Sequence, residues 1–321
     1  MIKRVLNSLQ NDQKNIKILN YLLLLYIISL ITFYDLTGTL IYIILFIFLF
    51  NPNKKIYIKE TLKNKVVQAF FIYFSIYILW IFGSEHYDVA LYQLRHNILL
   101  LYPLLFVSII KKEFIDKILF AFWITLLLSS IWSILMYFNI LHSPYQIDIE
   151  SIPFLYKSDF GFFLLTGIIL SFLYLSYKKN LNLLYKTMII VSIIIFSSNI
   201  FFIGARSYMI IYILMLIYFI YILQKSYSLK LLFPISIILI SLLIGIYSFN
   251  PNTREDINRA YIGIKESLLK QEYTSSAGQR IAMIVNSIPI IQKHLLFGVG
   301  AGDQVYEVKK NIQVAQDREL Q

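Results

Sequence analysis

The chain has 321 residues, of which 58% are hydrophobic and 15% are charged, and its mean hydropathy is +0.68. This composition excludes an ordinary soluble domain and is typical of an all-α protein that crosses a membrane many times. The net charge of +11 does not predict a nucleic-acid partner, because the lysines lie in short loops between apolar runs, where they orient membrane helices.

The chain contains no cysteine and only four histidines, which limits the metal chemistry that it can support. Without cysteine there are no disulfides, thiolate metal ligands or thiolate nucleophiles. The histidines are scattered and none has the spacing of a zinc-binding motif. We therefore expect no metal and no cofactor. The histidines are His86, His96, His142 and His294.

Membrane-length apolar runs dominate the sequence. A helix needs about 20 largely apolar residues to cross a bilayer, because its backbone polar groups must be satisfied within the segment. We predict a transmembrane helical bundle of about nine spans over residues 1–249, with two of the runs short. The runs cover residues 17–34, 36–50, 66–82, 97–110, 114–138, 160–177, 184–203, 206–223 and 229–249.

The charges of the connecting loops predict the orientation of these spans. Lysine and arginine concentrate in cytoplasmic loops of membrane proteins. Alternate loops hold seventeen basic residues on one side, against three on the other. The sequence therefore predicts a cytoplasmic N-terminus and an extracytoplasmic segment at residues 250–321. The first apolar run lacks a small-residue cleavage site, so we expect it to remain as a membrane anchor.

Two helices are predicted in this external segment. Thr253 and Asp256 have the spacing of a capping box before an amphipathic stretch, which would lie in the lipid interface or against the bundle. Ser276 and Gln279 have the same signature before a helix that we expect to end near Ser287. Proline at position 289 should bend or stop that helix.

Three glycines then alternate in the run from Gly298 to Asp303. Glycine lets the backbone approach a ligand closely, and loops rich in backbone N–H groups suit phosphate. A plain turn is the alternative, and Asp303 would then stabilise it. We interpret His294 as a residue that caps or packs this turn and the other three histidines as interfacial residues.

Three elements resemble the superfamily of O-antigen ligases and O-antigen polymerases. The run Gly204-Ala-Arg206-Ser207 opens the eighth predicted span, as a small-Arg-small motif does in that family. Arg280 begins the second external helix, and the run from Lys293 to Asp303 is similar to the family's glycine-rich turn. Members transfer glycans from polyprenyl pyrophosphate carriers outside the bacterial cytoplasmic membrane, and their large external loop also follows the ninth span.

The sequence departs from the family pattern at several positions. Ile284 stands where the family often has an aromatic residue, and Leu295 stands where a proline is usual. The family continues with a His-Asn element and further spans, whereas no histidine follows His294. We therefore expect a C-terminally truncated homologue, whose general base is not identified.

The resemblance implies a function and a set of site residues. The donor is an undecaprenyl-type pyrophosphate carrying a glycan, and the acceptor is a glycan or a lipid. A departing pyrophosphate needs positive charge, which guanidinium groups provide without a metal. The implied catalytic residues are Arg206 and Arg280, and the implied substrate-binding residues are Arg95, Gly298, Gly300 and Gly302.

Other functions remain open from the sequence alone. A ligase and a polymerase differ only in their acceptor. Many spans with few charges also fit a flippase or a small-solute transporter, although we find no pair of broken spans in matching halves and no acidic residue deep in a span. A truncated chain that acts only as an inactive partner subunit is a third alternative.

Overall fold

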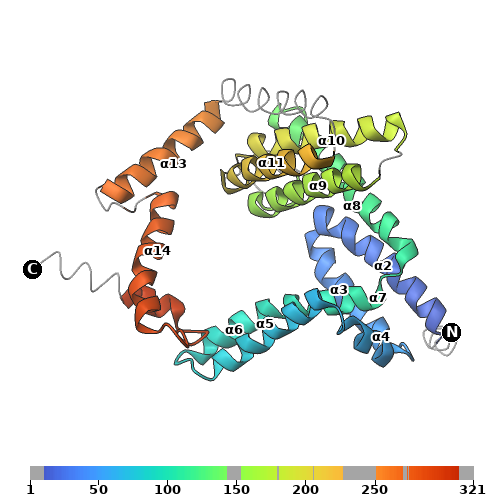
Figure 1. Ribbon diagram of the computed structural model, residues 1–321, viewed down its shortest axis with the longest axis horizontal. Helices are drawn as coiled ribbons and strands as arrows, with labels where there is room; N and C mark the ends of the chain where they lie inside the picture. The colour runs from blue at the N-terminus through green and yellow to red at the C-terminus, as the bar shows by residue number, and fades with distance from the viewer. Residues whose placement is uncertain are drawn as a thin grey trace, which may run out of the picture. The chain divides into compact units, whose positions relative to one another are not determined.

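The computed structural model describes residues 11–142, 153–178, 181–204, 206–226, 251–269, 273 and 275–310. Every regular element in these residues is a helix, as the composition predicts (Figure 1). The α-helices are α2 (Asp12–Thr32), α3 (Tyr34–Leu49), α4 (Lys54–Thr61), α5 (Lys65–Ile81), α6 (Tyr87–Asn97), α7 (Tyr102–Ile109), α8 (Lys112–Tyr137), α9 (Lys157–Tyr177), α10 (Leu183–Phe202), α11 (Arg206–Ser226), α13 (Pro251–Leu269) and α14 (Ser276–Lys293). A short 3-10 helix, η1 (Ile98–Leu101), precedes α7.

The chain divides into two compact units, each assembled from separate stretches of sequence. Unit 1 comprises Met1–Leu19, Leu45–Ile110 and Arg259–Gln321. Unit 2 comprises Asn20–Ile44 and Lys111–Asn258. The division into a bundle at 1–249 and an external segment at 250–321 stays a prediction.

Unit 2 is built around α8, α9 and α10, with α11 packed on α9. Its buried core joins side chains of these helices, including Phe196 and Ile168, which are fully buried. Gly167 of α9 lies where an added Cβ would collide with Leu126 of α8 and press on the Phe196 ring. Helix association within a membrane depends on such close packing, because lipid tails are as apolar as leucine.

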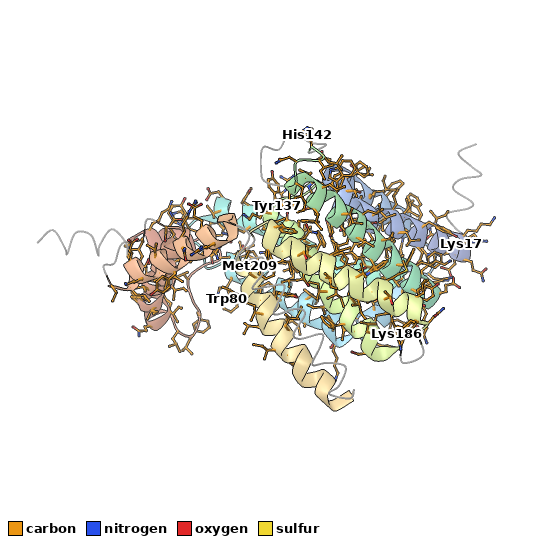
Figure 2. All side chains as sticks on the ribbon, turned by 90° about the horizontal axis from the view of Figure 1, so that it is seen from above. Lys17, Trp80, Tyr137, His142, Lys186 and Met209 are labelled. Atoms are coloured by element: carbon orange, nitrogen blue, oxygen red, sulfur yellow. The ribbon has the colours of Figure 1, made fainter. Side chains whose placement is uncertain are left out.

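A polar contact also joins α10 to α8 inside this core. The buried Asn199 side chain donates to the Ser130 carbonyl at 2.9 Å. Figure 2 shows Lys186, near the start of α10, and Tyr137, at the end of α8, at opposite ends of the bundle. Helices α8 and α10 therefore run in the same direction, and α9 runs antiparallel to both.

Unit 1 holds α4, α5, α6 and α7 together with α14. Ser108 of α7 bonds to Thr61 of α4 at 3.0 Å, and both side chains are buried. Asn64 caps α5 by accepting from the Val66 N–H. The loop of residues 82–86 joins α5 to α6, and the chain segment that follows α14 meets it (Figure 1).

The described residues contain four helices that are long and apolar enough to span a membrane, or up to five if one bent pair counts as a span. The four are α2, α8, α9 and α10, which match four of the predicted runs. The bent pair joins α3 and α4 at 114°. The count of about nine is therefore not confirmed, and the ninth run, 229–249, lies outside the described residues.

Several predicted spans differ from the structure for identifiable reasons. The run 97–110 is divided into η1 and α7, because Pro103 sits at the start of α7, where its missing N–H suits a helix beginning. α5 follows the predicted run 66–82 closely, but its 17 residues fall short of the length that a span requires.

Both helices predicted near the end of the chain form, but their ends differ from the prediction. α13 begins at Pro251, so Thr253 lies inside its first turn. α14 is capped by Ser275, not Ser276, with the Ser275 hydroxyl accepting from the Gly278 N–H at 2.9 Å. The helix also continues through Pro289 to Lys293. One proline removes a single backbone hydrogen bond, and a helix tolerates that loss near its last turn.

Candidate functional site

The glycine turn, Gly298–Asp303, follows the end of α14. His294 is the C-cap of that helix, and the Gly298 N–H donates to the His294 carbonyl at 2.8 Å. Gly298 has a φ of +64°, a left-handed conformation that glycine adopts at no steric cost. The prediction that His294 caps the turn is confirmed at the level of the backbone.

The glycine turn packs against the loop between α5 and α6. The Ala301 N–H donates to the Trp80 carbonyl at 3.2 Å, and the Gly302 N–H donates to the Ser84 hydroxyl at 3.0 Å. The Trp80 indole N–H donates in turn to the Phe297 carbonyl. Backbone groups of the turn are therefore satisfied by a segment more than 200 residues earlier in the chain.

Two of the three glycines are required by this close approach. A Cβ at Gly300 would collide with the Ser84 backbone, and a Cβ at Gly302 would collide with the His86 carbonyl. The glycines thus bring the turn against protein backbone. Their predicted role as a cradle for phosphate stays a prediction.

The Asp303 carboxylate is the centre of the docked turn. It accepts from the Glu85 N–H at 2.8 Å, from the His86 N–H at 2.9 Å and from the His86 ring Nδ1 at 2.7 Å. Burial by itself would raise the pKa of Asp303, but these hydrogen bonds from His86 and Glu85 outweigh it and hold the pKa below its usual range. Asp303 is therefore ionised at neutral pH and fixes the start of α6.

The His86 ring is held in one orientation by two neighbours. Its Nδ1 must carry a proton to bond the ionised Asp303. Its face stacks on the Tyr306 ring, with centroids 3.7 Å apart and planes 5° apart. In the neutral ring the other nitrogen, Nε2, is then a proton acceptor. The side chain is 35% exposed, so solvent or a substrate can approach it.

The sequence predicted His86 only as an interfacial residue and did not single out Ser84 or Trp80. The alternating glycines predicted a close approach, but nothing local identifies the segment that they approach. Asp303 was expected to stabilise its own turn, whereas its side chain bonds residues 85 and 86 of another loop.

The structure places the predicted arginines as follows. Arg280 is exposed in the second turn of α14, and the glycine turn follows the last turn of that helix, about 20 Å further along its axis. Arg95 is exposed on α6. Ala90 and Gln93 of α6 face the glycine turn, and Arg95 projects from the opposite side of the helix. Neither arginine contacts the glycine turn.

Arg206 is the first residue of α11. Gly204, with a φ of +62°, ends α10 by donating to the Phe201 carbonyl at 3.0 Å. Two positions after this left-handed glycine, the backbone of Arg206 begins α11. The N-terminus of a helix favours an anion. The convergence of Arg206 and Arg280 on one diphosphate stays a prediction.

A part of the chain that contains all three elements of the resemblance matches a family model. Residues 191–320 match the family model described as O-antigen ligase. The resemblance to the O-antigen ligase and polymerase superfamily is thereby confirmed. Neither the curated proteins nor the solved structures yield a match to the chain.

The match to O-antigen ligase and the apolar helices together support a multi-pass membrane protein with a function like that of a membrane glycan transferase. The family implies substrates that are lipid-linked glycans. Within the described residues, no three histidine, aspartate or glutamate side chains gather as a metal site would require.

Proposed function

We propose that the protein transfers a glycan from a polyprenyl-pyrophosphate donor to a hydroxyl acceptor at the outer face of the bacterial cytoplasmic membrane. The observation that carries this proposal is the O-antigen ligase match over residues 191–320, which includes Arg206, Arg280 and the glycine turn. Contact between the glycine turn and the loop 82–86 supports the predicted topology, because charge alone placed both segments on the same side.

Arg206 and Arg280 stabilise the charge that develops on the leaving pyrophosphate. The acceptor oxygen attacks the anomeric carbon, and the bond from that carbon to the pyrophosphate oxygen breaks with its electron pair. Guanidinium groups suit this task because their donors are fixed in a fork and always charged. The proposal keeps the metal-independent chemistry that the sequence predicts.

His86 accepts the proton of the attacking hydroxyl. Asp303 holds the Nδ1 proton and the ring orientation, which leaves Nε2 as the basic atom. This is the arrangement in which a carboxylate orients a histidine base. His86 is thus the general base that the sequence left unidentified.

The assay that tests this function uses the protein in lipid vesicles with a polyprenyl-pyrophosphate glycan. If the protein transfers the glycan, free polyprenyl pyrophosphate and a longer acceptor should appear together. A flippase would instead move the intact donor across the membrane without cleaving it. His86→Gln should lower the turnover rate by about 100-fold or more, because general-base catalysis contributes this much. Unchanged turnover would remove His86 from the mechanism.

A further inference from the structure

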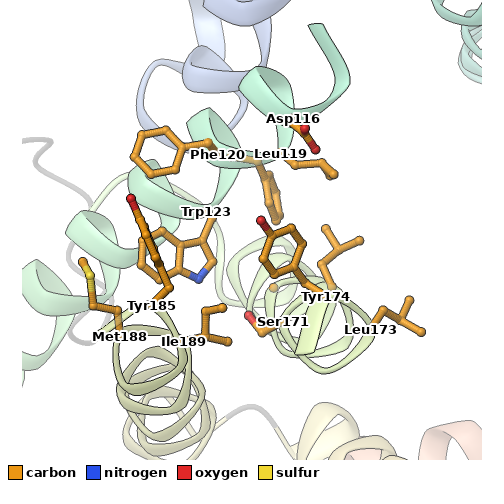
Figure 3. Close-up of a pocket in the computed structure, with 13 residues that line it drawn as sticks. Asp116, Leu119, Phe120, Trp123, Ser171, Leu173, Tyr174, Tyr185, Met188 and Ile189 are labelled. Carbon is orange, nitrogen blue, oxygen red and sulfur yellow. The ribbon is translucent and has the colours of Figure 1, made fainter. Parts of the chain in front are cut away.

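A cavity of about 430 Å³ lies among α8, α9 and α10 in unit 2. Its wall is mostly apolar and includes Leu119 and Phe120 of α8, Leu170 of α9, and Met188 and Ile189 of α10 (Figure 3). The residues that line it come from the first part of α8, the last part of α9 and the first part of α10. The cavity therefore lies at one end of the bundle, where α8 and α10 begin and α9 ends.

Two polar atoms in the cavity wall have no hydrogen-bond partner. They are the Ser171 hydroxyl and the Trp123 indole N–H, both of which are buried. Ser171 is only 4% exposed. Two other serines near this end of the bundle bond the carbonyl four residues earlier, Ser176 at 2.9 Å and Ser192 at 2.7 Å. Ser171 does not make this bond, so its hydroxyl remains available to a ligand that brings a hydrogen-bond acceptor.

The rim of the cavity is basic. Lys178, the C-cap of α9, is exposed, and Lys186, which follows the lining residue Tyr185 of α10, is partly exposed; we call these two lysines the basic rim. Lys178 donates to the Tyr174 hydroxyl at 3.0 Å, and Tyr174 lines the cavity. Lys186 lies in the first turn of α10, where the helix dipole favours anions.

The described charged residues of α8, α9 and α10 at this end of the bundle carry a net positive charge. Lys111 and Lys112 at the start of α8 add to the basic rim, while Glu113 and Asp116 oppose it. Asp116 lines the cavity mouth and would repel an anion placed next to it. An anionic headgroup should therefore lie nearer to Lys178 and Lys186 than to Asp116.

We infer that this cavity binds one acyl chain of an anionic phospholipid, with a lipid ester carbonyl accepting from Ser171 or Trp123 and the phosphate beside the basic rim. The spacing along α9 agrees with such a molecule. The Lys178 ammonium group bonds the Tyr174 hydroxyl, and Tyr174 lies three residues, or about 4.5 Å along the helix axis, from Ser171. This is the scale of the separation between a phosphate and an ester in a phospholipid.

The occupant is a bilayer phospholipid and not the glycan donor. Lys186 is near the start of α10, whereas Arg206 follows its end, and a helix of 20 residues is about 30 Å long. The cavity and Arg206 therefore lie at opposite ends of unit 2. A polyprenyl pyrophosphate whose phosphates bind Arg206 cannot place the same phosphates at the basic rim.

Fluorescence quenching tests this inference, because Trp123 is one of only three tryptophans. Trp80→Phe and Trp132→Phe together leave Trp123 as the single reporter. The protein is placed in vesicles that contain a small fraction of either brominated phosphatidylglycerol or brominated phosphatidylcholine. We expect the anionic lipid to quench Trp123 at a several-fold lower mole fraction than the zwitterionic lipid.

Lysine variants provide the control for charge. Lys178→Gln with Lys186→Gln should weaken the preference for phosphatidylglycerol by about fivefold per lysine. The matched pair Lys59→Gln with Lys63→Gln, in unit 1, should leave it unchanged. Equal quenching by the two lipids, or a preference that survives loss of the rim lysines, would overturn the inference. Stronger quenching by a brominated polyprenyl phosphate would identify a donor site instead and would also overturn it.

Discussion

The Asp303 carboxylate accepts a hydrogen bond from the His86 ring at 2.7 Å, although the two residues are 217 positions apart. This contact and the two backbone bonds beside it attach the glycine turn to the start of α6. The turn belongs to the part of the chain that matches O-antigen ligase, while the loop 82–86 lies outside that part. The predictions below concern this attachment and the chemistry that we assign to it.

Removing the Asp303 side chain should detach the glycine turn. Gln93 of α6 and Gln304 bond each other at 3.2 Å, and the chain has no cysteine, so Gln93→Cys with Gln304→Cys forms a clean reporter pair. Asp303→Ala should lower the yield with a short thiol cross-linker about tenfold or more, since hydrogen bonds to a charged group contribute about 1.5 to 3 kcal/mol each. An undiminished yield would show that Asp303 does not hold the turn.

The attachment should also depend on pH in one direction. The pKa of Asp303 is lower in the folded protein than in the unfolded chain, so its stabilising effect is complete above the unfolded value, about 4, and is lost as the pH falls through the folded value. The cross-linking yield of the Gln93→Cys and Gln304→Cys pair, measured after brief acid exposure, should decrease when the pH is lowered below about 4. In Asp303→Asn this acid transition should be absent.

Alanine at the glycines tests the close approach. Gly300→Ala places a Cβ against the Ser84 backbone and Gly302→Ala places one against the His86 carbonyl, which should each destabilise the docked turn by about 1 to 3 kcal/mol. Gly83→Ala is the matched control in the same region, because its Cβ would meet nothing nearer than 3.9 Å. The cross-linking yield and the transfer rate should fall in Gly300→Ala and Gly302→Ala and stay unchanged in Gly83→Ala. Equal effects of all three substitutions would contradict the packing.

Helices could be predicted from the sequence because their signals are local. The runs that became α2, α8, α9 and α10 carry enough apolar residues in succession to be recognised without any partner. Two details were not predicted because each depends on a single residue. Pro103 divides the run 97–110, and Ser275 caps α14 one residue before the predicted position.

The candidate site could be predicted only in part, since it depends on long-range contacts. The glycines and Asp303 stand out as a motif, but the sequence contains nothing that pairs them with His86. Nor does hydropathy show that Arg95 projects from the side of α6 opposite Gln93, which follows from where the glycine turn docks. Ser171 and Trp123 were not distinguished from other residues of apolar spans, because only the packed helices show that they lack partners.

Arginine variants should distinguish the predicted phosphate-binding residues. Arg206→Lys keeps the charge but loses the two-pronged donor geometry, so we expect slower transfer with normal membrane insertion. Arg95→Ala should have a smaller effect than either Arg206→Ala or Arg280→Ala, since it projects away from the docked turn. The rates are compared in the vesicle assay, after protein levels are matched.

The most direct measurement is glycan transfer by vesicles that carry either the unaltered protein or Arg280→Ala. Lys265→Ala, which removes another exposed cation of unit 1, is the control. Stabilisation of the leaving pyrophosphate predicts that Arg280→Ala lowers transfer by about 100-fold or more, while Lys265→Ala leaves it unchanged. Equal transfer by all three proteins would contradict the proposed function of Arg280 and, with it, the mechanism.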